Sequence, residues 1–151
     1  MAGPGQLRGT SGDTVRGVVE RVGSEPHATL VLMRASGDFV APRGIDEALL
    51  RGLTGIEVMA TGAFTDECAA EAGPRGARVF AMTRFVVRAV GGVSAVDGIL
   101  TEENGQWVIV TADGTRLPVS RVPALLEAMA GARVYFAGSL TALPVAYGVI
   151  R

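Results

Sequence analysis

Short apolar stretches rich in β-branched residues alternate along the whole chain with turns that contain glycine. Branched side chains pack well on a pleated surface, so stretches of this kind are typical of β-strands. The first part of the chain predicts strands over 15–22, 28–33, 38–41, 57–64 and 79–90. The second part predicts strands over 96–100, 106–111, 115–119, 133–140 and 145–151. The best turn signal is Asp113-Gly114, which favours a tight hairpin.

Two segments show helical spacing instead. Residues 45–53 place leucines at 49, 50 and 53 on one side, and residues 123–130 repeat this pattern with Leu125, Leu126 and Met129. Pro123 suits a first helical turn, and glycine follows each segment at the position that commonly ends a helix. The fold class predicted is therefore all-β with short helices.

The two parts of the chain repeat one another. Residues 49–58 align with 125–134, and the shorter pieces 15–18 and 35–38 align in the same order with 96–99 and 112–115. Collinear matches at turns, a helix end and strands favour a duplication over coincidence. The repeat predicts an N-terminal arm over 1–14, flexible or bound by a partner, a first module over 15–90, a linker over 91–95 and a second module over 96–151.

Each module reads strand, strand, strand, helix, strand, strand, with a glycine in the middle of the first strand. This order, carried by Val15-Arg16-Gly17-Val18, Ser36-Gly37, Leu49-Leu50 with Gly55 and Val58, Gly62 and their counterparts, resembles the OB-fold. The resemblance implies two tandem five-stranded OB-fold-like barrels. It further implies binding of oligonucleotides, oligosaccharides, small anions or proteins, mainly across the second and third strands.

Composition narrows the classes of function. The net charge is −1, and all fourteen basic residues are arginine, so the basic excess typical of a nucleic-acid binder is missing. One cysteine and one histidine leave no Cys/His zinc site. No spacing suggests catalysis, so we expect neither an enzyme nor a cofactor or metal. With no signal peptide and no transmembrane segment recognised, a cytoplasmic location is expected, and peripheral membrane association through a partner stays open.

Two sets of residues are candidates for binding. The copies differ most at residues 65–78, where a long loop is predicted in the first copy only, and one interpretation is a neutral insertion. The other interpretation is a loop specialised for binding a partner. The single tryptophan, Trp107, is either a core residue or a further partner-binding residue. The partner-binding candidates are Asp66, Glu67, Glu71, Arg75, Arg78 and Trp107. The candidates on the OB face are Arg34, Phe39, Arg43, Arg116 and Arg121.

The function expected from these observations is that of a non-catalytic accessory or scaffold subunit. Its partners would be protein subunits of a larger complex, a membrane complex approached from the soluble side included. The alternative is binding of a small ligand, an oligosaccharide or a single-stranded nucleic acid through the OB face, where arginine and aromatic side chains suit phosphates and bases.

Overall fold

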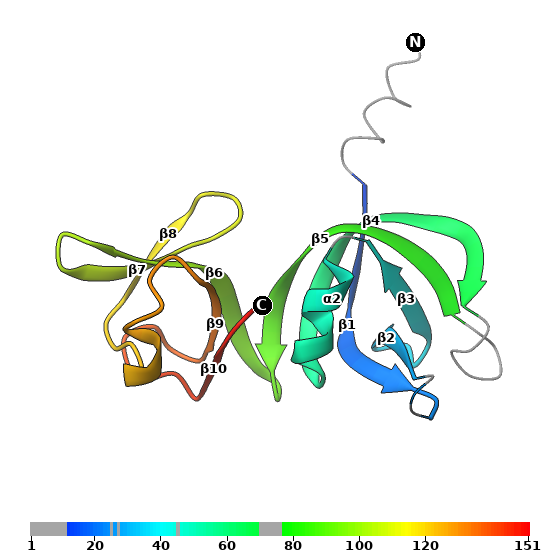
Figure 1. The fold of residues 1–151 in the computed structure, drawn as a ribbon, viewed down its shortest axis with the longest axis horizontal. Helices are drawn as coiled ribbons and strands as arrows, with labels where there is room; N and C mark the ends of the chain where they lie inside the picture. Colours follow the sequence, from blue (N-terminus) through cyan, green and yellow to red (C-terminus); the bar gives the residue numbers. More distant parts are fainter. Residues whose placement is uncertain (1–11, 25, 27, 45, 70–76) are drawn as a thin grey trace, which may run out of the picture. The chain divides into compact units, whose positions relative to one another are not determined.

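The computed structural model describes residues 12–24, 26, 28–44, 46–69 and 77–151. The described chain is mostly β-strand with one short α-helix, which confirms the all-β class (Figure 1). It divides into two compact units. The first comprises the described residues up to Thr54 together with Val58–Phe85, and the second comprises Gly55–Glu57 and Val86–Arg151.

The described residues of the first unit form five strands and one short helical segment. The strands are β1 (Asp13–Val22), β2 (Thr29–Met33), β3 (Phe39–Arg43), β4 (Ile56–Ala69) and β5 (Ala77–Val90). The strands β1, β2 and β3 pair antiparallel in that order, and β3 then pairs in parallel with β5. The strand β4 pairs with both β1 and β5. The helical segment consists of α2 (Glu47–Leu50) and a 3-10 turn, η1 (Arg51–Leu53), which bury Leu50 and Leu53.

The second unit contains five further strands. These are β6 (Val93–Glu103), β7 (Gln106–Val110), β8 (Arg116–Val119), β9 (Arg133–Ala137) and β10 (Ala146–Val149). They pair antiparallel in the order β8, β7, β6, β9, β10, and the last residues of β5 pair with the start of β6. The core of the unit is a buried apolar cluster of Leu100, Ile109, Val119, Leu126, Val134 and Phe136.

The helix predicted over 123–130 is wrong. Only a 3-10 turn forms there, η2 (Ala124–Leu126), and Pro123 before it has an extended backbone. Hydrogen bonds run from Leu126 to Pro123 and from Met129 to Leu126, three residues back rather than four. The end of the segment is bonded to β6 instead, since Gly131 N–H donates to Leu100 O and Leu100 N–H donates to Ala132 O. Of the three residues that the pattern placed on one side, Leu126 is buried and Met129 packs against the same apolar cluster, whereas Leu125 is 78% exposed.

The long loop predicted over 65–78 is also corrected where the chain is described. The strand β4 continues to Ala69, and β5 already begins at Ala77. The small inward side chains of these two alanines pack with Val31, Ala41 and Val79 in a buried cluster. The outward positions are polar, so the segment resembles a loop in sequence although it forms the two arms of a β-hairpin.

Corresponding parts of the two copies share backbone geometry. In the first copy Arg34 N–H donates to Asp38 O at 2.9 Å, and in the second Thr111 N–H donates to Thr115 O at the same distance. The adjoining strands also match in register, since Val18 faces Met33 in one copy while Ile99 faces Val110 in the other.

The first strand of each copy contains a glycine, Gly17 or Gly98, for a steric reason. A Cβ on Gly17 would lie 3.1 Å from Leu32 Cβ, and a Cβ on Gly98 would lie 2.8 Å from Ile109 Cγ2. The backbone of each first strand therefore approaches its hairpin partner more closely than any side chain allows.

Two tight hairpins have consecutive residues at positive φ. Gly91 and Gly92, at φ 56° and 82°, join β5 to β6, so residues 91–95 hold this turn and the first residues of β6. Asn104 and Gly105, at φ 53° and 79°, join β6 to β7. Such pairs match the twist of the flanking strands. Among the described residues, no helix has the length and hydropathy to cross a bilayer.

Candidate functional site

The β4–β5 hairpin carries the predicted partner-binding residues that the structure describes. Asp66 and Glu67 are exposed on β4, and Arg78 is exposed on β5. We call these three residues the hairpin surface. Glu71 and Arg75 lie outside the described residues. The hairpin surface therefore places charges of both signs on strand backbone rather than on a loop.

Phe64 anchors the hairpin beside this surface. Its ring packs edge-on against Phe80, with centroids 5.0 Å apart and an interplanar angle of 71°. The guanidinium of Arg78 lies 4.4 Å from the Phe64 centroid, and that of Arg34 lies 5.9 Å from it. We call Arg34, Phe64 and Arg78 the cation–aromatic cluster. The contacts are within the range in which an aromatic ring attracts a cation.

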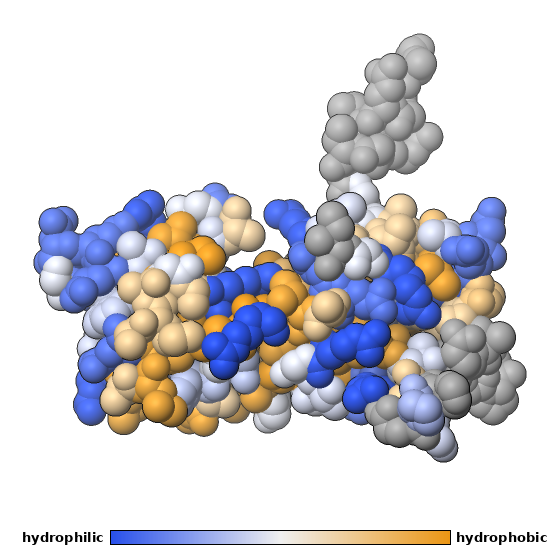
Figure 2. Space-filling view, viewed as in Figure 1, coloured by the Kyte–Doolittle hydropathy of each residue, from blue (hydrophilic) through white to orange (hydrophobic). Residues whose placement is uncertain are grey.

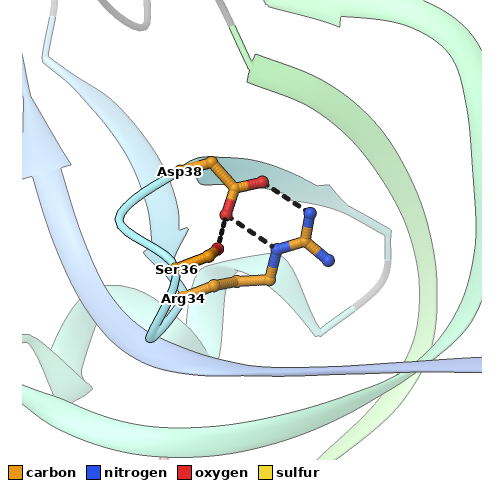
Figure 3. Close-up of polar contacts among 3 residues, drawn as sticks. All are labelled: Arg34, Ser36 and Asp38. Carbon is orange, nitrogen blue, oxygen red and sulfur yellow. Dashed lines mark hydrogen bonds and ion pairs between the residues drawn. The ribbon is translucent and has the colours of Figure 1, made fainter.

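Arg34 is held in this cluster by the β2–β3 turn (Figure 3). Its Nε donates to Asp38 Oδ1 at 3.2 Å and its Nη2 donates to Asp38 Oδ2 at 2.5 Å, while Ser36 Oγ also donates to this carboxylate. The hydrogen bonds from Arg34 and then Ser36 lower the pKa of Asp38 to about 2. The Arg34 charge is therefore compensated at neutral pH, whereas no described carboxylate pairs with Arg78.

The other two OB-face candidates of the first unit make internal contacts. Phe39 is half-buried and packs against the apolar cluster beneath β2 and β3. Arg43 donates from Nη1 to the neighbouring Pro42 carbonyl at 2.9 Å. The Phe39 ring therefore contributes to packing of the core rather than to an open stacking platform.

In the second unit the candidates are spread over separate contacts. Arg116 forms an exposed ion pair with Glu103 across two strands, and this pair lowers the pKa of the Glu103 carboxyl. Arg121 is exposed after β8. Trp107 is half-buried and packs against the apolar cluster of this unit. In the β7–β8 ladder Trp107 lies opposite Val119 and Arg116 lies opposite Val110, and no hydrogen bond or ion pair joins Trp107 to either arginine.

A buried carboxylate that the sequence analysis missed lies in the second unit. The Asp97 side chain has a relative exposure of 2%, and its Oδ2 accepts a hydrogen bond from Val87 N–H at 2.5 Å. Arg133 Nε and Nη2 donate to its two oxygens, both at 3.2 Å. All of these contacts link β6 to its neighbours, so we interpret Asp97 as a structural residue. The signal was available, since Asp97 is an acidic residue in an apolar strand.

The matching positions of the first copy carry the opposite charges. Aligning the repeats places Arg16 at the position of Asp97, and Glu57 at the position of Arg133. The aligned positions are therefore charged in both parts of the chain, with opposite signs.

The chain matches no family model, and searches of curated proteins and of solved structures also give no match. No group of acidic, histidine or cysteine side chains suited to a metal ion occurs among the described residues. Arg78 belongs to both the hairpin surface and the cation–aromatic cluster, so the two adjoin on the β4–β5 hairpin.

Proposed function

We propose that the chain is a non-catalytic adaptor subunit that binds partner proteins of a larger assembly through the hairpin surface. The observation that supports this proposal is the difference between the copies. The strands β4 and β5 have fourteen residues each, whereas their counterparts β9 and β10 have five and four. The extra length exposes Asp66, Glu67 and Arg78, and mixed charges on a firmly held element suit a polar protein interface.

We further propose that the two units are OB-like barrels. In support, the pairings of the first unit run from β1 through β2, β3, β5 and β4 back to β1, with the helix between β3 and β4. In the second unit β8 pairs only with β7, which corresponds to a barrel open between β8 and β10. OB-like barrels serve many binding functions, so this architecture is compatible with an adaptor and does not by itself select one.

An anionic ligand, such as a single-stranded nucleic acid, is the second candidate. Arg78 in the cation–aromatic cluster favours it, because this guanidinium has no carboxylate partner among the described residues. The packing of Phe39 and Trp107 against apolar clusters disfavours it, since stacked bases need exposed rings. The adaptor is therefore our first proposal.

Photo-cross-linking inside the source cell tests the adaptor proposal. A photoreactive amino acid replaces Glu67, and a matched variant carries it at Ala112, an exposed turn residue of the second unit. We expect a defined cross-linked protein from position 67 alone. That protein is then purified, and its affinity for the Asp66→Arg/Glu67→Arg variant should fall at least ~tenfold. The substitutions replace two negative charges with positive ones, which would repel a partner surface that is complementary to the unaltered hairpin surface.

Two outcomes would contradict this proposal. One is equal cross-linking from both positions, and the other is unchanged affinity of the charge-reversed variant.

Titration of a fluorescent oligonucleotide examines the second candidate. Saturable binding that is lost in Arg78→Ala, but retained in Arg121→Ala, would favour the ligand-binding function.

A further inference from the structure

The two arginines that lie against the Phe64 ring differ in one respect. Arg34 is also held by Asp38, whose two carboxylate oxygens accept hydrogen bonds from Arg34 Nε and Nη2. The Arg78 guanidinium lies nearer to the ring, at 4.4 Å from its centroid, but no carboxylate among the described residues pairs with it. The N–H donors of Arg78 are therefore not used by the described part of the chain.

The ring that holds Arg78 is itself fixed by the hairpin. Phe64 packs edge-on against Phe80, which has no exposed surface. The next residue along β4, Thr65, donates from Oγ1 to the backbone oxygen of Val79 at 3.1 Å, and this hydrogen bond ties β4 to β5 beside the ring. A guanidinium that stacks on a fixed ring keeps its N–H groups free at its edge, and it loses less conformational freedom when it binds a ligand.

The acidic residues of the same hairpin decide which anion suits Arg78. Asp66 and Glu67 are exposed on β4, and no described arginine pairs with either carboxylate. Figure 2 shows hydrophilic side chains at the right-hand end of the first unit, where the ends of β4 and β5 lie in Figure 1. A nucleic acid presents a row of phosphates, which two carboxylates would repel. A protein segment can instead place one carboxylate at the arginine and basic side chains beside it.

We propose that Arg78 binds an aspartate or glutamate side chain of the partner protein, in a segment whose basic side chains face Asp66 and Glu67. The Arg34–Asp38 pair shows the geometry that suits such a contact, with two hydrogen bonds from one guanidinium to both oxygens of one carboxylate. Bidentate pairs of this kind give both strength and specificity. This inference rests on the adaptor function and adds to it the charge pattern of the partner segment.

Peptide selection with the purified full chain tests this charge pattern. A random peptide library displayed on phage is selected against the unaltered chain and, in parallel, against Arg78→Gln. We expect the unaltered chain to recover peptides that carry an acidic residue close to basic ones, and the variant to recover peptides without the acidic residue. The library replaces the cellular partner. A chain that selects such peptides but gives no defined cross-linked protein in the cell would keep the carboxylate site and contradict only the adaptor function.

A double-mutant cycle then assigns the peptide carboxylate to Arg78. One recovered peptide is synthesised with its acidic residue and with the corresponding amide, and fluorescence anisotropy gives both dissociation constants. The amide form should bind the unaltered chain at least ~tenfold more weakly, whereas Arg78→Gln should bind both forms alike, because the charged hydrogen bonds are gone. Arg84→Gln is the matched control, since Arg84 is exposed on the same strand, and it should retain the difference.

Circular dichroism of each variant establishes that its fold is retained. Recovery of no peptide, or only of peptides without an acidic residue, would overturn the proposal. So would a difference between the two peptide forms that persists in Arg78→Gln, or one that is lost equally in Arg84→Gln. Saturable binding of the fluorescent oligonucleotide that requires Arg78 would also overturn it, since the guanidinium would then bind phosphate.

Discussion

Replacing Asp97 with asparagine should destabilise the second unit substantially. Both carboxylate oxygens accept hydrogen bonds, one from Arg133 alone and the other from Val87 N–H and Arg133. Asparagine has the same shape, but it offers one oxygen and one NH₂ group, so its NH₂ group must face a donor. The substitution therefore removes the charge and one acceptor without creating a cavity.

The magnitude follows from two contributions. A buried donor left without an acceptor costs about 1–3 kcal/mol. Breaking a buried ion pair by removing one partner costs about 3–5 kcal/mol. The Arg133 side chain is 23% exposed and can turn toward water, so the cost of losing its ion pair with Asp97 is lower here. We expect the free energy of unfolding to fall by about 2–4 kcal/mol in total.

Urea unfolding followed by Trp107 fluorescence measures this change, because the only tryptophan packs in the apolar cluster of the same unit. The unfolding midpoint should fall by about 1–2 M for a protein of this size. Glu102→Gln, an exposed acidic residue on the same strand, is the matched control and should change stability by less than about 0.5 kcal/mol. Equal midpoints for the two variants would refute the structural role of Asp97.

Three further outcomes are expected. Gly98→Ala should destabilise the second unit by about 1–3 kcal/mol in the same urea assay, because the added Cβ meets Val110 C at 2.7 Å, whereas Gly52→Ala, where nothing lies within 4 Å, should not destabilise. Asn104→Ala should cost about 1–2 kcal/mol at its positive φ, while Asn104→Gly should be nearly neutral, as thermal unfolding can establish. The pKa of Asp38 lies below its unfolded value, so its contribution to stability is present above about pH 4 and is lost as pH falls toward 2; an NMR titration should show the Asp38 midpoint moving upward in Arg34→Gln.

The local features of the fold were predictable from the sequence because the residues that determine them are adjacent. The Asn104-Gly105 pair supplies the positive φ angles that its hairpin needs, and Leu50 and Leu53 mark the buried side of the helical segment. The extension of β4 to Ala69 was not predictable in the same way. Its polar residues face outward, and the residues that its inner side contacts, such as Val31, are distant in the chain.

Contacts between residues that are distant in the chain also limit how far the candidate site could be predicted. The hairpin surface follows from the difference in length between the copies, which the sequence shows directly. The cation–aromatic cluster joins Arg34, Phe64 and Arg78, which the alternation of residues alone does not bring together. The contacts of Asp97 reach residues 10 and 36 positions away, so they depend on strand pairing across the whole second unit.

The exchange of charges between the two copies bears on how the chain reaches its fold. Strands from copies of one pattern can pair with the wrong neighbour while the chain is still partly unfolded. If β1 paired with β9, Arg16 would meet Arg133, and if β6 paired with β4, Asp97 would meet Glu57. Each misfolded pairing would set like charges side by side, and the second would bury Asp97 without a cation. The reversed signs would therefore disfavour these two wrong pairings.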